Sequence, residues 1–335
     1  MVLKNRDTQF HCKNIPSWIK LIALENLLKK QKTNLEIKFE EDNMKNENNI
    51  SKFIISMEAT CDLSKETIKK YDFKIIDMEF LIDEKEYNTA KDDVVSSDLY
   101  SKMKNGAKTS TSQVNKQLYI EYFEDLLKDG QDVLHLAFSS GLSQTFQSAL
   151  QASKEINASS KNKVYVIDSL CACAGHGLFA ILAKEYLDAG NNINETIKYL
   201  EDIKLKVSHM FSVDNLKYLA NGGRIKKTSA MVGNILHIKP VMKMDNEGHL
   251  VLVQKVISRR KAIKEIFNKY VETFNPKYKH CIISHADCLE DAKHLEKLIK
   301  DFRDIDCTIT NLGAIIGSHS GPGTLALFFV SKCTR

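Results

Sequence analysis

The sequence has no uncharged apolar run that approaches the roughly 20 residues of a membrane-spanning helix, so we expect no such helix. It also has no strong excess of one charge, because 48 Lys and Arg stand against 43 Asp and Glu along the chain. The net charge of +5 is too small and too dispersed to predict the clustered basic face of a nucleic-acid-binding protein. With 43% hydrophobic and 27% charged residues, collagen-like, disulfide-scaffold and wholly disordered classes are excluded as well.

The eight cysteines include no C-x-x-C pair, and residues 1–14 show no apolar core or cleavage pattern of a signal peptide. We therefore expect reduced thiols and a cytoplasmic protein. Cys171 and Cys173, with His176 nearby, leave a metal site open as one interpretation. We favour the other interpretation, in which they are small residues starting a helix packed on a sheet, and predict no metal.

The length of 335 residues exceeds what one hydrophobic core usually supports, which favours two domains. Before them, residues 1–51 are expected to form an extension with an amphipathic helix at 16–28 and a polar linker at 38–49. That helix would dock on the main body, on a partner or on a membrane surface. We place the first domain at 52–207 and the second at 208–331.

Strands and helices alternate in the first predicted domain, which is the pattern of a parallel sheet with helices on its faces. The expected strands are 53–55, 73–82, 132–138 and 163–168, and the expected helices are 64–70, 116–128, 144–156 and 175–187. In the second domain a hairpin turn at 245–248 occurs among α/β units, which predicts a mixed sheet. The predicted fold class is α/β with two domains, the first a mostly parallel sheet flanked by helices and the second mixed.

Three loops rich in hydroxyl groups, small residues or histidine lie beside predicted element ends, at 108–112, 139–145 and 317–323. The second loop leads from the carboxyl end of a strand into a helix, and open parallel sheets bind ligands at those ends. A helix N-terminus with serine hydroxyls suits a carboxylate or a phosphate. The alternative is that Ser139 or Ser140 only caps the helix.

His319 lies in the third loop, among glycines that let the backbone approach a neighbour closely. With Ser140 as nucleophile and His319 as base, the chain could be a serine hydrolase or acyltransferase. Ser139-Ser140-Gly141 is not a G-x-S-x-G elbow, however, and no acidic residue is obviously placed to orient His319. A Walker A motif and a strand–G-x-G-x-x-G–helix pattern are absent, so no nucleotide site is predicted.

An ordered set of short motifs resembles the DegV family from about residue 52 to residue 330. The motifs are Thr60-Cys61-Asp62-Leu63-Ser64, Lys108-Thr109-Ser110, Ser139-Ser140-Gly141-Leu142-Ser143, Gly222-Gly223-Arg224-Ile225, His285-Ala286-Asp287, and His319 with Gly321-Pro322-Gly323. Each motif alone is short, but the ordered set is specific.

The resemblance implies a two-domain α/β protein that buries one long-chain fatty acid, of roughly 14 to 18 carbons, between its domains. Such proteins are similar to the carrier subunit of bacterial fatty-acid kinase, which presents the carboxylate to a separate ATP-dependent subunit for acyl-phosphate formation in phospholipid metabolism. This implies a lipid carrier rather than an enzyme, with no cofactor besides the bound acid. A transient membrane-surface contact stays open, as does a regulatory or scaffolding protein with a structural lipid.

The resemblance also implies which residues contact the ligand. Contacts to the carboxylate would fall on Thr109, Ser110, Ser139, Ser140, Ser143 and His319. Arg224 would meet the acyl phosphate or the kinase subunit near the mouth of the site. The acyl chain would be lined by Leu142, Phe146, Leu178, Phe179, Met231, Ile235 and Leu236.

Four departures from the family pattern stand out. Glu58-Ala59 replaces Asp-Ser after the first strand, Thr111-Ser112 replaces Gln-Pro, Gln144 replaces a glycine, and Ile257 replaces an arginine. The head-group positions are retained, so the resemblance still implies lipid binding. Gln144 and Ile257 bear on pocket shape and on recognition by a kinase subunit.

Overall fold

The computed structural model describes residues 53–90, 96–225 and 238–335. These described residues belong to one compact unit. The predicted N-terminal extension, with its helix and linker, lies outside the described residues, as do Met231, Ile235 and Leu236. The domain boundary at residue 207 stays a prediction.

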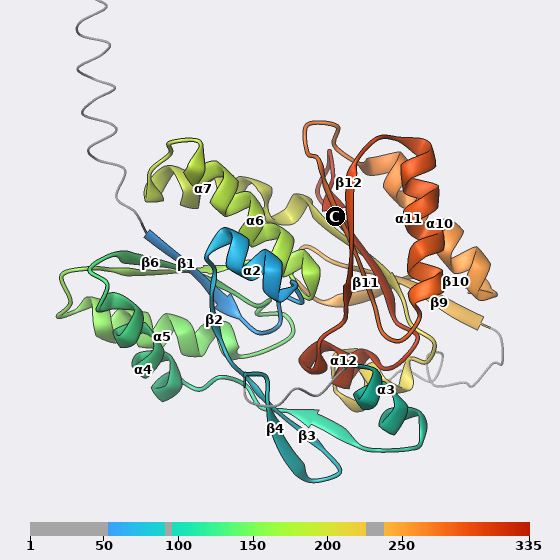
Figure 1. The fold of residues 1–335 in the computed structure, drawn as a ribbon, viewed down its shortest axis with the longest axis horizontal. Coiled ribbons are helices and arrows are strands. Elements are labelled where there is room, and N and C mark those ends of the chain that lie inside the picture. Colours follow the sequence, from blue (N-terminus) through green and yellow to red (C-terminus); the bar gives the residue numbers. More distant parts are fainter. Residues whose placement is uncertain (1–52, 91–95, 226–237) are drawn as a thin grey trace, which may run out of the picture. The chain divides into compact units, whose positions relative to one another are not determined.

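A four-stranded parallel sheet forms the first half of this unit, with strand order β2-β1-β6-β7. Its strands are β1 (Phe53–Glu58), β2 (Lys74–Ile76), β6 (Asp132–Ala137) and β7 (Val164–Asp168). Helices α4 (Lys116–Leu127) and α5 (Thr145–Asn157) cover one face, and α6 (Ala174–Asp188) covers the other (Figure 1). All six residues of β1 are buried, because both faces of a parallel sheet are covered by its crossover helices.

A six-stranded mixed sheet forms the second half, with strand order β10-β9-β8-β13-β11-β12. Its strands are β8 (Val207–Ser212), β9 (Ile238–Met244), β10 (Leu250–Ile257), β11 (His280–His285), β12 (Asp306–Asn311) and β13 (Leu325–Val330). Only β11 and β12 pair in parallel. Helices α10 (Arg259–Thr273) and α11 (Leu289–Phe302) cover its outer face (Figure 1). The predicted α/β fold class, a parallel sheet followed by a mixed one, is confirmed.

Helix α6 joins the two sheets. It packs against β1 of the parallel sheet and against β8, β11 and β13 of the mixed sheet. A helix enclosed on both sides needs apolar residues around most of its circumference, and eleven of its 15 residues are buried. The carboxyl ends of the parallel strands therefore face the inner surface of the mixed sheet across the start of α6.

The predicted strand at 73–82 is in fact two strands that belong to different sheets. Lys74–Ile76 (β2) pairs with β1, whereas Glu79–Ile82 (β3) joins a small antiparallel sheet with order β4-β3-β5. Its other strands are β4 (Lys85–Asn88) and β5 (Thr109–Thr111). The first hydroxyl-rich loop is thus partly a strand, because its backbone finds a partner in β3.

The remaining elements are short. They are α2 (Lys65–Tyr71), α3 (Ser96–Lys104), α7 (Ile193–Ile203), the 3₁₀ turn η1 (Lys204–Lys206), α8 (Lys217–Asn221) and α12 (Ala314–Ser320). Helix α12 covers part of the third predicted loop, so His319 lies in the last turn of a helix. No helix among the described residues is long and apolar enough to cross a membrane.

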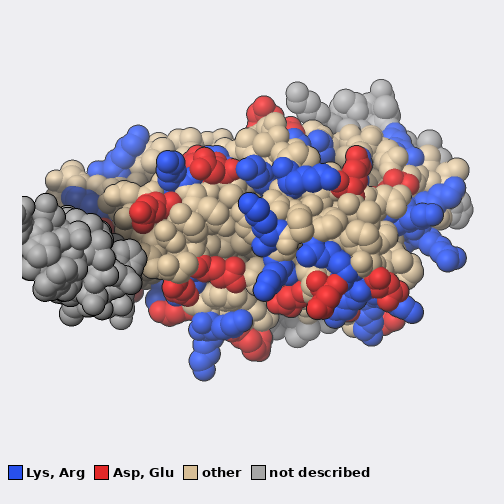
Figure 2. All heavy atoms as spheres, turned by 90° about the horizontal axis from the view of Figure 1, so that it is seen from above, with Lys and Arg blue, Asp and Glu red and all other residues tan. Residues whose placement is uncertain are grey.

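Charged side chains of both signs are interspersed on the face drawn in Figure 2. This agrees with the small net charge of +5 and gives that face no single-sign field.

Candidate functional site

A cavity of about 500 Å³ opens at the carboxyl ends of the parallel strands. Thr60 follows β1, Phe138 follows β6 and Cys173 follows β7, and all three line the cavity. The opposite wall comes from β8, β13 and α12. Apolar side chains dominate the lining and include Phe138, Leu142, Phe211, Leu312, Ile315 and Phe328. Its volume lies in the range of small-molecule sites, about 300–1,000 Å³.

The loop after β6 forms one wall of the cavity and is held from behind. The Ser139 hydroxyl is fully buried and donates to the Gly248 carbonyl (2.9 Å), in the turn between β9 and β10. A Cβ on Gly141 would lie 2.6 Å from the Glu247 and Gly248 carbonyl oxygens, so this glycine permits the close approach. Ser140 lines the cavity, and its hydroxyl bonds no other described residue.

Neither Ser139 nor Ser140 caps α5, so the helix-capping interpretation is wrong. The residue before the helix, Gln144, makes no capping bond with its side chain. Instead the Ser143 hydroxyl accepts from the Thr145 backbone N–H (3.2 Å) and bonds the Thr145 hydroxyl (2.8 Å). Ser143 and Thr145 also line the cavity.

His319 reaches the cavity from the last turn of α12. Its Nε2 atom lies 2.8 Å from Thr111 Oγ1 on β5. Gly222 leaves room for the ring, because a Cβ there would lie 2.4 Å from His319 Nδ1. Burial, and then the nearby charge of Arg224, lower the pKa of His319 to about 4. The imidazole is therefore neutral at pH 7 and can donate from only one nitrogen.

Arg224 supplies the permanent positive charge of the cavity wall. Its Nη1 atom donates to the Gly222 carbonyl (2.6 Å), which ties the guanidinium to the turn after α8. Burial lowers the pKa of Arg224, but guanidinium groups remain protonated in proteins. Among the described lining residues, the wall therefore provides one positive charge and several neutral hydrogen-bond donors to a bound anion.

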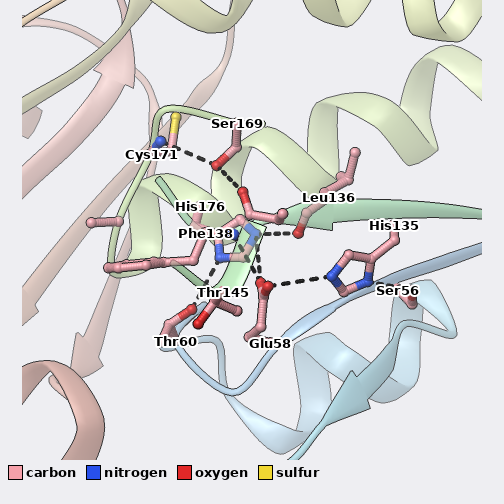
Figure 3. Close-up of polar contacts among 12 residues, drawn as sticks. Ser56, Glu58, Thr60, His135, Leu136, Phe138, Thr145, Ser169, Cys171 and His176 are labelled. Carbon is pink, nitrogen blue, oxygen red and sulfur yellow. Dashed lines mark hydrogen bonds and ion pairs between the residues drawn. The ribbon is translucent and has the colours of Figure 1, made fainter. Parts of the chain in front are cut away.

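Glu58, at the carboxyl end of β1, is a fully buried carboxylate just behind the cavity (Figure 3). It accepts from the Tyr119 hydroxyl (2.5 Å) and the Phe138 backbone N–H (2.9 Å), and His135 Nε2 lies 3.3 Å away. Burial alone would raise the pKa of Glu58, but His135, His176 and Tyr119 outweigh it and hold the pKa at about 2. The charged carboxylate thereby fixes the backbone where β6 enters the Ser139–Ser143 loop.

His176 connects this cluster to the cavity through Thr60 (Figure 3). His176 Nε2 lies 2.7 Å from the Leu136 carbonyl, which can only accept, so Nε2 carries the proton. Burial lowers the pKa of His176, so the ring is neutral and Nδ1 accepts. Thr60 Oγ1, 3.3 Å from Nδ1, therefore donates its proton away from the cavity. Thr60 therefore presents only the lone pairs of its hydroxyl oxygen and its methyl group to the cavity.

Asp62 is a second buried carboxyl group near the cavity, and its pKa is shifted in the opposite direction from that of Glu58. It is 8% exposed, has a left-handed φ of 46°, and neither carboxyl oxygen accepts a geometrically good hydrogen bond from a described residue. Burial raises its pKa to about 7, and the nearby Cys173 thiol and Gly313 N–H offset this only in part. Asp62 is not the cap of α2, because Ser64 caps this helix by accepting from the Thr67 backbone N–H (3.1 Å).

The raised pKa of Asp62 gives a prediction for stability. Its pKa rises from 3.8 to about 7 on folding, so the native state binds more protons between these values and the stability falls as pH rises from about 4 to about 7. A shift of this size corresponds to about 4 kcal/mol across the window. Asp62→Asn, which tolerates the same φ, should remove this slope. Urea unfolding of both proteins from pH 4 to 8 checks it, and identical slopes would contradict it.

Only some of the residues predicted to contact the ligand line the cavity. Ser140, Ser143, His319, Arg224 and Leu142 all line the cavity. Thr109 instead donates to the Ser318 carbonyl (2.8 Å), Ser110 is exposed, and Ser139 is committed to Gly248. Phe146, Leu178 and Phe179 lie outside the lining, the last two because α6 buries them in the core between the sheets.

The side chains of Cys171, Cys173 and His176 are not arranged to bind a metal ion together. His176 bonds Leu136 and Thr60, and burial raises the pKa of Cys171 to about 11, which disfavours a thiolate ligand. In the part of the chain that the structure describes, no group of three or more His, Cys, Asp or Glu side chains could hold a metal ion.

Sequence reasoning assigned no site role to Thr111, Thr60 or Glu58. Thr111 belongs to the hydroxyl-rich loop predicted at 108–112, and it lies two residues beyond Thr109 on the same face of β5. Glu58 is the only charged residue of the buried strand β1, and a charge there signals a buried partner.

The similarity to known proteins extends over nearly all of the described residues. A family model with the description "Uncharacterised protein, DegV family" matches residues 52–332. A DegV domain-containing protein of Clostridium perfringens is 35% identical over 285 residues, which covers 84% of this chain and 98% of that protein.

Solved structures show the same similarity. A DegV lipid-binding protein from Thermotoga maritima superimposes with a TM-score of 0.74 at 27% identity, covering 85% of this chain and all 100% of that one. DegV from Bacillus subtilis, described as a fatty-acid-binding protein, gives a TM-score of 0.71 at 27% identity over 84% of this chain and 99% of that one. Because the matched region contains every strand of both large sheets and every residue that lines the cavity, this chain belongs to the DegV family.

Proposed function

We propose that the protein binds one long-chain fatty acid in the 500 Å³ cavity. The observation that carries the proposal is a mostly apolar cavity with Ser140, Thr111, His319 and Arg224 on its wall. These side chains suit the carboxylate, and the apolar lining suits the chain. The lipid-binding and fatty-acid-binding relatives from Thermotoga maritima and Bacillus subtilis support the same ligand class.

The two ends of such a ligand contribute differently to affinity. Burial of about 15 methylene groups at about 0.8 kcal/mol each gives on the order of 12 kcal/mol before the costs of association. A hydrogen bond to the charged carboxylate adds about 1.5–3 kcal/mol. The acyl chain therefore sets most of the affinity, while the hydroxyls, His319 and Arg224 select a carboxylate and orient it.

The geometry favours a carrier over a serine hydrolase or acyltransferase. His319 Nε2 bonds Thr111 instead of Ser140, and no described acidic side chain bonds His319. With its pKa lowered to about 4, this imidazole is a weak base at neutral pH. A serine without a base to take its proton is a poor nucleophile but still a hydrogen-bond donor.

A carrier that displays a carboxylate needs a partner that acts on it. We propose that this partner is an ATP-dependent fatty-acid kinase subunit, met in the cytoplasm, with Arg224 facing the acyl phosphate or that subunit. A transient membrane contact would then serve loading or release of the acid. Thr109 and Ser139 would support the site indirectly, through Ser318 and Gly248.

The experiment is a titration of delipidated protein with a long-chain fatty acid. Ser140→Ala and His319→Ala should each raise Kd about 10- to 100-fold, because each removes one hydrogen bond to a charged group. The exposed Ser159→Ala is the matched control and should bind like wild type. Unchanged Kd in both site variants would contradict the assignment, as would losses of affinity that only follow losses of thermal stability.

A further inference from the structure

A second cavity, of about 220 Å³, lies across the mixed sheet from the first. Along β8, His209 and Phe211 line the larger cavity, whereas Ser208 and Met210 line the smaller one. Neighbouring residues of a strand point to opposite faces, so most of the smaller cavity lies on the face covered by α10. His209 belongs to both linings.

Positive charge dominates the lining of this second cavity. Four cationic side chains contribute to it, namely Lys206, Lys243, Lys269 and Arg335, and no Asp or Glu does. Lys269 pairs with Glu272 (2.6 Å), which lies outside the lining. Within the described ranges, Lys206 and Lys243 have no acidic side chain at ion-pair distance.

The surroundings strengthen the field of these lysines. Lys206 and Lys243 are half-buried, so their charges are screened less than those of fully exposed lysines. A concave wall with one sign of charge focuses its field and concentrates counter-ions. Lys206 and Lys243 lack an acidic partner among the described side chains, so a bound anion would relieve the repulsion between like charges in the pocket.

Neutral donors and fixed geometry complete the lining. The hydroxyl of Ser208 makes no hydrogen bond to another described residue and is available to a ligand. Arg335 is held in place, since Nη1 donates to the Leu170 carbonyl (2.6 Å) and Nη2 to the Lys204 carbonyl (2.9 Å). Arg335 therefore contributes charge, while Lys206, Lys243 and Ser208 are free to donate.

We infer that this basic pocket binds a phosphate group, as free phosphate, as a small phosphomonoester or as the head group of an anionic phospholipid. Lysine ammonium groups bind phosphate as point charges without a fixed planar geometry, which suits a tetrahedral oxyanion. The site is separate from the cavity proposed for the fatty acid and does not depend on that proposal.

The test measures phosphate binding by the full chain with isothermal titration calorimetry, against sodium chloride at matched ionic strength. Saturable phosphate binding is expected, and Lys243→Gln or Lys206→Gln should weaken it about tenfold, because each removes a charge-assisted hydrogen bond. Lys297→Gln, at an exposed position on α11, removes the same charge elsewhere and should bind like wild type. Two pocket variants keep the test decisive if one of them fails to fold.

A second arm separates the two sources of phosphate. Sedimentation with phosphatidic acid vesicles that is lost in Lys243→Gln, and absent with phosphatidylcholine, identifies a lipid head group. Phosphate binding without vesicle binding identifies a free phosphate or phosphomonoester. The proposal is overturned if neither phosphate nor vesicles bind, or if Lys297→Gln weakens binding as much as the pocket variants.

Discussion

Glu58→Ala is expected to lower the free energy of unfolding by about 3–5 kcal/mol, the usual cost of removing one partner from a buried charged group. The loss leaves the Tyr119 hydroxyl and the Phe138 backbone N–H without an acceptor in a fully buried place. Chemical denaturation at pH 7 measures it. Phe138 directly precedes the loop of residues 139–143, which lines the cavity. Loss of the acceptor for its N–H should therefore disturb this loop and lower fatty-acid affinity as well.

Two comparisons isolate the role of the charge at Glu58. Glu79→Ala, on the exposed face of β3, makes the same change and should alter stability by no more than about 0.5 kcal/mol. Glu58 has a pKa of about 2 against 4.5 when unperturbed, so its contribution is complete above pH 4.5 and is lost as pH falls toward 2. A Glu58→Ala variant as stable as wild type at pH 7 would show that the cluster is not structural.

Ala326→Phe is expected to weaken fatty-acid binding about 50-fold or more. Ala326 lies on β13, is 5% exposed and lines the large cavity, so a phenyl ring there occupies space that the acyl chain would use. Displacement of about three methylene groups at about 0.8 kcal/mol each accounts for that factor. Kd for a long-chain fatty acid, measured on delipidated protein, checks it.

The control for this variant is Ala158→Phe, which adds the same ring at an exposed position after α5. It should leave Kd unchanged. The thermal stability of delipidated Ala326→Phe should match or exceed that of wild type, because the ring fills a void instead of crowding a packed core. Wild-type affinity in Ala326→Phe would place the acyl chain outside this cavity.

Much of the fold could be predicted from the sequence because its elements carry strong local patterns. Strand β6 has five buried positions among six, and a short apolar run between turn residues predicts such a strand. The single strand predicted at 73–82 was wrong. Its first half pairs with β1 and its second half with β5, and these pairings between separate segments cannot be read from the local sequence pattern.

The candidate site could be predicted only where a residue type is tied to a motif. Ser140 and His319 lie on the cavity wall, and their contact with a carboxylate stays a prediction. Thr111 was missed because the register of β5 against β3, with Thr111 opposite Phe80, depends on tertiary pairing. Leu178 and Phe179 look like lining residues in the sequence, but apolar residues of a core and of a cavity wall are the same in composition.

The buried polar cluster was the least predictable feature, since its members come from distant segments. Glu58 meets His135 and Tyr119 across 77 and 61 residues, and Thr60 meets His176 across 116 residues. No local spacing links such residues, and only the arrangement of β1, β6, α4 and α6 brings them together.

Native mass spectrometry of the gently purified protein tests the central claim most directly. The proposal predicts a folded species heavier by the mass of one long-chain fatty acid, and release of that acid on denaturation and organic extraction. Ala326→Phe should carry markedly less of it. A well-folded wild-type protein that carries no fatty acid and takes none up when offered it would contradict the proposed function.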